Sequence, residues 1–338
     1  MTKYSRRDFL KATGALATAM LVPRSLLAAG TGTKLNVLFI ALDDLRPQLG
    51  CYGQIQIKSP NMDRLAQRGL LFERTYCQQA ICMSSRASLL SGYRPDKGKI
   101  YENGPLFTHV PDALTLNQHF LNNGYETSSM GKVYHHASDY EQGWSTKAFQ
   151  PQGAWYGRGY LDKEAIQIAR DYDSKSQKGD RKGIGPAFES PDVPDNAYPD
   201  GLIAEHAIQE IHRLKDKPFF IAAGFKKPHL PFCAPKRYWD MYSADQIKLA
   251  DNPFAPKGAP KDALTSWGEL RLYHGMPGKG PMPDDLARKL VHGYYACVSY
   301  ADAMIGRVLD ELDRLDLARN TVVVLWGDHG WKLGDHGM

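Results

Sequence analysis

The fold is decided by residues 35–44, "LNVLFIALDD", a largely apolar run that ends in two aspartates. Such a run, rich in β-branched and aromatic residues, is typical of a strand buried on both faces. Similar runs occur at 218–224, "PFFIAAG", and at 321–327, "TVVVLWG". Helical patterns precede them at 201–214 and 283–317. Strands alternating with helices predict an α/β fold with a largely parallel or mixed central sheet and helices on both faces.

Two further helices and two long loops complete this outline. After Ser59 and Pro60, which suit a helix start, "NMDRLAQRG" predicts a helix that ends at Gly69. The stretch 115–124, "TLNQHFLNNG", repeats the arrangement. Polar stretches rich in Gly, Pro and Asp run over about 138–199 and 243–282. Loops of that length usually form a binding rim or are mobile.

Composition excludes several classes of protein. The chain has 338 residues, of which 43% are hydrophobic and 23% charged, as in globular proteins and unlike disordered or fibrous ones. Its net charge is +5, but the first 29 residues, with five basic and one acidic, account for +4. The remaining chain therefore carries no basic excess that would indicate a nucleic-acid partner.

The N-terminus has the pattern of an export signal. Residues 1–29 contain a basic start, an apolar run over about 12–22 and then small residues. The apolar run is too short for a membrane span, which needs about 20 residues. The pair Arg6-Arg7, followed by Phe-Leu, is similar to the bacterial twin-arginine signal. We therefore expect a periplasmic or secreted protein, with residues 30–338 as the exported domain.

The five cysteines are an odd number, so at least one is unpaired or chemically special. Their spacing does not suggest zinc, and any disulfides cannot be assigned from the sequence. Cys82 stands directly before a small-residue run that reads as a helix, in "QQAICMSSRASLLSGYRPD". The residues alone leave a structural and a catalytic role open for it.

Acidic residues follow two of the predicted strands. Asp43 and Asp44 follow the first strand, and Asp328 and His329 follow the last. Ligands of open parallel sheets bind beyond the carboxyl ends of the strands, where these residues would meet. Carboxylates in one small pocket need a cation, and hard oxygen ligands favour Ca²⁺ or Mg²⁺.

Two basic motifs follow other apolar segments. Each contains lysine and histidine, which beside a metal ion suit an anionic tetrahedral substrate, although a single histidine is more often structural. The residues are Lys132, His135 and His136 in "SMGKVYHH", and Lys226, Lys227 and His229 in "GFKKPHLPF".

These motifs, in this order, resemble those of the type I sulfatases of the alkaline phosphatase superfamily, with the iduronate-2-sulfatase group the nearest likeness. The resemblance runs from about Asn36 to the last residue and is carried by "ALDDLRPQLGCYG", "SPNMDRLAQRG", "CMSSR", "GKVYH", "KPHLPF", "ACVSYADAMIGRVLDEL" and "WGDHGWKLGDHG".

The resemblance implies a formylglycine enzyme. A formylglycine-generating enzyme would oxidise Cys82 to the aldehyde, whose hydrate is the nucleophile, and the N-terminus of the following helix would face the developing negative charge. Ca²⁺ is the expected cofactor, with Mg²⁺ as the less favoured ion. The expected metal ligands are Asp43, Asp44, Asp328, His329 and the group derived from Cys82.

The resemblance also assigns roles to basic residues. Arg86 would fix the hydrate, Lys132 would contact the sulfate, and His135 would be the base that collapses the sulfated hemiacetal. His229 is the candidate acid for the leaving oxygen. The implied reaction is removal of sulfate from a sulfated sugar, a uronate or a related unit of a glycosaminoglycan or other sulfated polysaccharide.

Two departures from the family pattern stand out. Position 84 is Ser where the family has Pro or sometimes Ala, which bears on recognition by the maturation enzyme. The sequence stops at Met338, inside "GDHGM", where the family continues into a second active-site lysine and a C-terminal subdomain, so we expect a truncated domain. Two alternatives stay open: a phosphodiester or phosphonate monoester hydrolase of the same superfamily, and an inactive binding relic.

Overall fold

The structure is a computed structural model, and the predicted export signal, residues 1–29, lies outside the residues that it describes. It describes residues 34–338 without 102–103, 137–138, 140, 177–181 and 266–267.

The opening apolar run forms the inner strand β1 (Asn36–Leu42) of a parallel sheet. Its neighbours are β4 (Phe219–Phe225) on one side and β6 (Thr321–Gly327) on the other, and β2 (Glu126–Gly131) lies beyond β4. Each pairing among these four strands is parallel. The described residues thus confirm the predicted α/β class, with no antiparallel member in this sheet.

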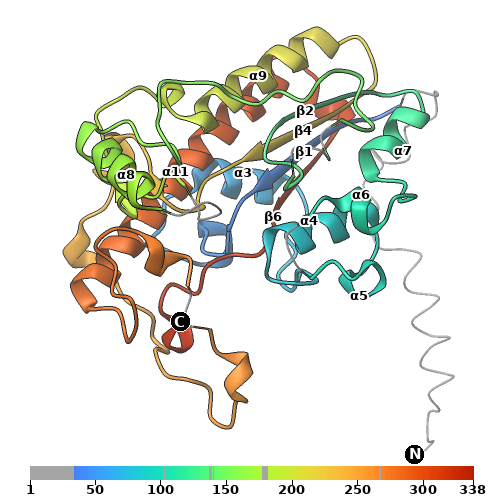
Figure 1. Cartoon of the computed structure of the whole chain (residues 1–338). Coiled ribbons are helices and arrows are strands. Elements are labelled where there is room, and N and C mark those ends of the chain that lie inside the picture. Colours follow the sequence, from blue (N-terminus) through green and yellow to red (C-terminus); the bar gives the residue numbers. More distant parts are fainter. Residues whose placement is uncertain (1–33, 102–103, 137–138, 140, 177–181, 266–267) are drawn as a thin grey trace, which may run out of the picture. The chain divides into compact units, whose positions relative to one another are not determined.

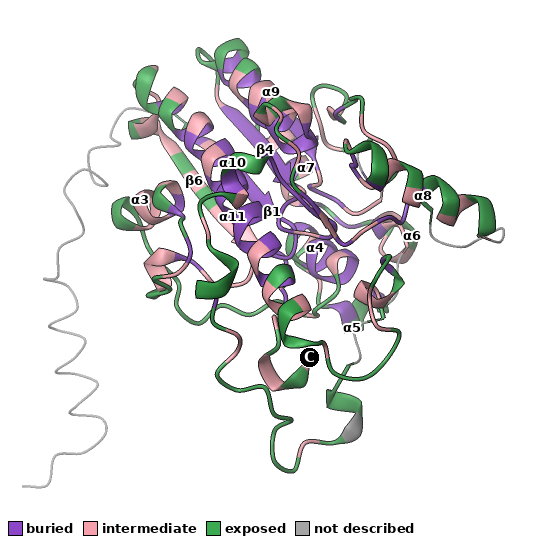
Figure 2. Ribbon diagram, turned by 90° about the vertical axis from the view of Figure 1, so that its left-hand side faces the viewer, coloured by how far each residue is buried: buried purple, intermediate pink, exposed green. Residues whose placement is uncertain are grey.

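Alternate residues of the strands pack on opposite layers of helices. On one face, Leu38 and Ile40 of β1 join a hydrophobic core with α9 (Pro199–Leu214) and α11 (Asp284–Arg314). On the other face, Phe39 packs in a separate core with residues of α4 (Cys82–Ser91), α6 (Leu106–His109) and α7 (Leu116–Asn122) (Figure 1). Figure 2 shows β1 and β4 buried between the layers, whereas β6 at the edge carries exposed residues.

The predicted helices are present with slightly different ends. The stretch after Ser59 forms α3 (Pro60–Arg68), and the stretch 115–124 forms α7 (Leu116–Asn122). Short strands β3 and β5 pair in parallel as a second sheet. The remaining elements are α4 (Cys82–Ser91), α5 (Pro95–Gly98), α6 (Leu106–His109), α8 (Lys163–Lys175), β3 (Phe188–Glu189), β5 (Phe232–Cys233) and α10 (Lys236–Trp239), with 3₁₀ turns at Gly50–Tyr52, Asp195–Ala197, Ala244–Gln246, Lys261–Ala263, Leu270–Leu272, Ala318–Asn320 and Asp335–Gly337.

Several elements were not predicted, among them strand β2 and helix α8. Strand β2 has the polar sequence "ETSSMG", yet its Thr127 is buried and its hydroxyl donates to the Gly143 carbonyl at 3.1 Å. Helix α8 lies inside the first long polar stretch and begins where Asp162 accepts hydrogen bonds from the amides of Glu164 and Ala165. All five cysteines are free thiols. Among the described helices, none is long and apolar enough to cross a membrane.

Candidate active site

The ends of β1 and β6 meet at one edge of the sheet, as predicted. Asp44 follows β1 with a φ of 65°, so the chain turns sharply there. Its amide donates to Asp328 Oδ1 at 2.8 Å, across 284 positions of sequence. His329, next in the chain, has its Nε2 at 3.0 Å from Asp44 Oδ1. Two distant segments therefore build one acidic cluster.

Cys82 is the first residue of α4 and faces this cluster. Its Sγ lies 3.1 Å from His329 Nε2 and 3.8 Å from Asp44 Oδ1. Candidate ligand atoms of Asp44, Cys82, Asp328 and His329 all lie within 4.8 Å of one another. Asp43, the fifth predicted ligand, forms an overlapping group with Cys82 and His229. The structure thus brings together the residues that the sequence singled out as ligands.

Arg86 lies behind the pocket and not in its lining. The side chain is fully buried, and Nε donates to Asp328 Oδ2 at 2.9 Å while Nη2 donates to Asp43 Oδ1 at 3.1 Å. Nη1 donates to the carbonyls of Lys132 and Val133. The guanidinium therefore fixes two of the acids, and its predicted contact with a hydrate on residue 82 stays a prediction.

The neighbouring charges set the ionisation of the two aspartates after β1. Burial alone would raise the pKa of Asp43, but Lys132, whose Nζ is 2.5 Å from Oδ2, together with His229 and Arg86 holds this pKa well below its usual value. Burial raises the pKa of Asp44, and the Asp43 carboxylate adds to this, against the opposing effect of His229.

The Cys82 thiol has little nucleophilic character in this setting. Burial raises its pKa, and the negative charge of Asp43 raises it further, although Lys132 opposes the effect. Because the thiolate is the reactive form of cysteine, residue 82 would be a weak nucleophile as a plain thiol.

The cluster has the composition of a site for a hard divalent cation. Among the described residues, the permanent cations that form ion pairs with the carboxylates of Asp43, Asp44 and Asp328 are Arg86 and Lys132. An anionic substrate would meet excess negative charge there unless a cation were bound. Carboxylate oxygens with one imidazole suit Ca²⁺ or Mg²⁺, so the residues fit the metal that the sequence predicts.

Two of the predicted histidines border the same space. His135 lines the pocket, and burial together with Lys132 lowers its pKa to about 4, so the imidazole is neutral near pH 7. His229 has Nδ1 at 2.6 Å from the Leu230 carbonyl, which assigns the proton to Nδ1. Its Nε2 then faces Asp44 Oδ2 at 3.9 Å.

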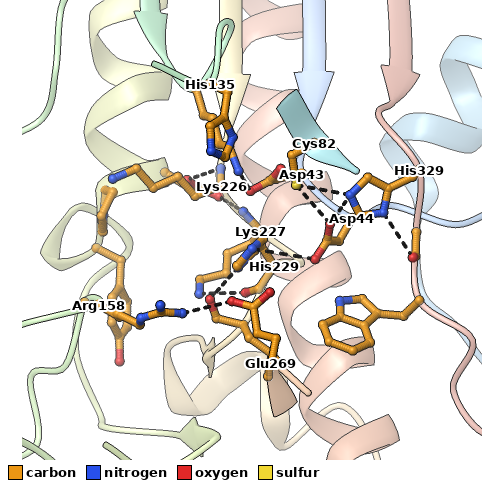
Figure 3. Close-up of a pocket in the computed structure, with 18 of the residues that line it drawn as sticks. Asp43, Asp44, Cys82, His135, Arg158, Lys226, Lys227, His229, Glu269 and His329 are labelled. Atoms are coloured by element: carbon orange, nitrogen blue, oxygen red, sulfur yellow. Dashed lines mark hydrogen bonds and ion pairs between the residues drawn. The ribbon is translucent and has the colours of Figure 1, made fainter. Parts of the chain in front are cut away.

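A cavity of about 570 Å³ joins these groups to residues that the sequence did not single out (Figure 3). Both long polar stretches contribute residues to its wall, as a binding rim would require. In the sequence, the stretch "WYGRGY", which places one arginine among glycines and aromatic residues, could have pointed to the part of the wall near Arg158. The additional lining residues include Trp155, Arg158, Asp200, Glu269, Tyr300 and Trp331.

Comparison with known proteins agrees with this geometry. The family model "Sulfatase" matches residues 35–338 of the chain. This chain belongs to the sulfatase family. The model of the twin-arginine translocation signal matches residues 3–23 of this sulfatase, so the protein is exported across a membrane.

Among similar sulfatases, iduronate 2-sulfatase of Mus musculus is 38% identical over 318 residues, which are 90% of this chain and 56% of that protein. The Homo sapiens iduronate 2-sulfatase is also 38% identical, over 92% of this chain and 57% of its own length. A sulfatase of Formosa agariphila is 30% identical, over 90% of this chain and 60% of that protein. The chain therefore spans just over half the length of these curated relatives.

Solved structures share the fold of this sulfatase at low sequence identity. The phosphonate monoester hydrolase of Agrobacterium radiobacter has a TM-score of 0.65 at 22% identity, over 90% of this chain and 64% of that one. A structure solved in complex with its substrate D-glucosamine-2-N,6-O-disulfate has the same TM-score and identity, over 90% and 67% of the two chains. These neighbours confirm the alkaline phosphatase-like sulfatase fold.

Proposed function

We propose that this chain carries the catalytic part of an exported sulfuric ester hydrolase that removes sulfate from a sulfated uronate. The observation that carries the proposal is Cys82 at the first position of α4, beside Asp44, Asp328 and His329. The uronate rests on the identity to iduronate 2-sulfatases. The net reaction consumes one water and converts the sulfate ester into a sugar hydroxyl and hydrogen sulfate.

The proposal uses two groups that this family generally employs. Hydrated formylglycine at residue 82 supplies the oxygen that attacks sulfur, and a Ca²⁺ held by the acidic cluster supplies positive charge. Two groups stabilise negative charge on the sulfate in this proposal. One is the ammonium of Lys132, which is paired with Asp43, and the other is the N-terminus of α4.

The two histidines move protons in this proposal. His229 holds its Nδ1 proton on the Leu230 carbonyl, so as the imidazolium it would donate its second proton, from Nε2, to the leaving sugar oxygen and become neutral. His135 is neutral above about pH 4 and buries Nδ1 without a hydrogen-bond partner in the described residues, so this imidazole can accept a proton from residue 82.

The test is to express the chain with a formylglycine-generating enzyme and to analyse the peptide containing residue 82 by mass spectrometry. We expect conversion of the thiol to the aldehyde, together with faster hydrolysis of 4-nitrophenyl sulfate than of bis(4-nitrophenyl) phosphate. Among sulfated disaccharides, 2-O-sulfated uronates should react fastest. The Cys82→Ala variant should bind sulfated sugar without turnover.

Other outcomes contradict the proposal. Faster hydrolysis of the phosphate diester would identify a phosphodiester or phosphonate monoester hydrolase. If residue 82 stays a thiol and neither ester is hydrolysed, the chain is an inactive binding relic and not an enzyme.

A further inference from the structure

The pocket that contains the acidic cluster also carries two cations that the proposed chemistry does not use, Arg158 and Lys226. Figure 3 shows Arg158 and Glu269 across the pocket from Cys82 and His329. Both cations line the cavity. They come from different parts of the chain, Arg158 from the first long polar stretch and Lys226 from the segment directly after β4.

Arg158 is held in one orientation by its neighbours. Its Nη1 donates to Glu269 Oε1 at 3.1 Å and to the Tyr273 hydroxyl at 2.7 Å. The guanidinium also lies over the Tyr273 ring, with Cζ 5.5 Å from the centroid. Nε and Nη2 have no hydrogen-bond partner among the described residues. Two adjacent N–H groups of a fixed guanidinium suit paired contacts with a carboxylate or sulfate.

Lys226 is positioned through its backbone. Its amide donates to Oδ1 of the buried Asp200 at 2.8 Å. In the described part of the chain, the ammonium makes no hydrogen bond or ion pair. Burial lowers the pKa of Lys226, with the neighbouring Asp200 charge in opposition.

The ammonium of the adjacent lysine, Lys227, is hydrogen-bonded, unlike that of Lys226. Lys227 donates to the carbonyls of His229 and Pro231, so its ammonium is occupied by the protein. Lys132 is likewise occupied by Asp43. A cation in a cavity without a hydrogen-bond partner of its own favours an anionic ligand, since the ligand restores the interactions that burial removed.

We propose that Arg158 and Lys226 form a subsite for a second anionic group of the substrate, separate from the sulfate that is hydrolysed. This inference rests on the proposed function and adds the residues that select the substrate. A uronate carboxylate and a second sulfate share the required chemistry.

The test compares three substrates: a 2-O-sulfated uronate, the same sugar with its carboxylate reduced to the alcohol, and the reduced sugar with a second sulfate. The ratio of kcat/KM for each charged substrate over the reduced sugar measures the subsite. Arg158→Gln and Lys226→Gln should each lower at least one ratio about tenfold, mainly through KM, because a charge-assisted contact is lost. The ratio that falls identifies the anion as carboxylate or sulfate.

Matched controls are Arg94→Gln and Lys215→Gln, which remove exposed cations outside the pocket and should leave the ratios unchanged. Arg158→Gln also removes the contacts with Glu269 and Tyr273, so thermal unfolding is measured for each variant. Lys226→Gln breaks no side-chain hydrogen bond or ion pair among the described residues, so this variant carries the test if Arg158→Gln is unstable. Unchanged ratios in Lys226→Gln would overturn the subsite.

A second readout separates this inference from the proposed function. In the Cys82→Ala background, calorimetric titration with the same sugars measures binding without turnover. Weaker binding of the charged sugars by Lys226→Gln, with little change for the reduced sugar, supports the subsite. If the unsubstituted protein hydrolyses no sulfate ester but Lys226→Gln still weakens binding of the charged sugars selectively, the proposed function is refuted and the subsite is not.

Discussion

Arg86 joins the acids of two strand ends through one side chain. It is fully buried and contacts Asp328 at 2.9 Å and Asp43 at 3.1 Å. Removing one partner of a buried ion pair leaves an unpaired charge, which costs far more than loss of an exposed pair. Arg86 is thus the residue on which the geometry of the cluster depends.

We expect Arg86→Met to lower the free energy of unfolding by about 3 to 5 kcal/mol, because the buried Asp328 carboxylate loses its cation and Asp43 keeps only Lys132. Urea denaturation in metal-free buffer measures this change. Arg68→Met is the control: Arg68 pairs with Asp313 on the surface, and its loss should cost about 1 kcal/mol or less. Equal effects of the two substitutions would contradict the role of Arg86.

The adjacent serines of α4 differ in hydrogen bonding. The Ser84 hydroxyl is buried without a partner in the described residues, whereas Ser85 donates to the Asp328 carbonyl at 2.5 Å. Ser84→Ala should therefore raise the free energy of unfolding by about 1 kcal/mol, and Ser85→Ala should lower it by a similar amount. Thermal or urea unfolding of both variants measures the difference, and a destabilised Ser84→Ala would refute it.

Proline at position 84 is compatible with the helix for a local reason. The first bond into α4 runs from the Ser85 amide to the Ile81 carbonyl, so position 84 lies in the first turn, where an amide has no helical partner. We expect Ser84→Pro to fold and to raise the yield of formylglycine under co-expression. Mass spectrometry of the peptide gives the yield, and an equal or lower yield would show that Ser84 is not limiting.

Helices α3 and α11 are joined by a buried cap. Asp302 of α11 accepts hydrogen bonds from the amides of Asn61 and Met62, at the start of α3. The Asp302 carboxylate therefore caps the N-terminus of α3, a role that a residue directly before the helix normally has. Burial nevertheless raises the pKa of Asp302 to about 6.

This cap predicts a pH dependence of stability. The pKa of Asp302 rises from 3.8 to about 6 on folding, so the native state binds more protons between these values and the free energy of unfolding falls as pH rises through them. The loss is on the order of 3 kcal/mol. Asp302→Asn should flatten the profile between pH 4 and 6. Asp310→Asn, at an exposed carboxylate of the same helix, controls for net charge and should retain the slope.

Across the whole molecule, the acidic cluster ties the start of the described chain to its end. Asp44 and Asp328 are joined directly, and the parallel pairing of β1 with β6 places them there. A cation bound by both would stabilise the folded state in proportion to its affinity, because the unfolded chain lacks the cluster.

We expect Ca²⁺ to raise the melting temperature of the chelator-treated protein. At a hundred times Kd, the gain is about 2.7 kcal/mol in the free energy of unfolding. Asp44→Asn should weaken this response, because it removes one carboxylate ligand. Differential scanning calorimetry with Ca²⁺ and with Mg²⁺ measures the shift and ranks the two ions. The metal site would be refuted if neither ion shifted the unfolding transition.

The sequence by itself determined the fold class and the acidic part of the site. The apolar runs of β1, β4 and β6 are buried strands because an unbroken apolar segment has to be covered on both faces. Parallel strands carry their carboxyl ends to one edge, so Asp43 and Asp328 were predictable as neighbours from their positions after two strands.

Only the tertiary structure decided the rest of the site. Strand β2 is polar and becomes a strand by pairing with β4 and bonding to the segment near Gly143. Arg158 meets Glu269 across 111 positions, and no local pattern of either segment indicates that contact. The physical reason is that periodicity and strand ends are local properties of a sequence. The packing of distant segments decides which wall of the pocket a side chain faces. It also decides whether the hydrogen-bonding groups of that side chain are already paired with another segment.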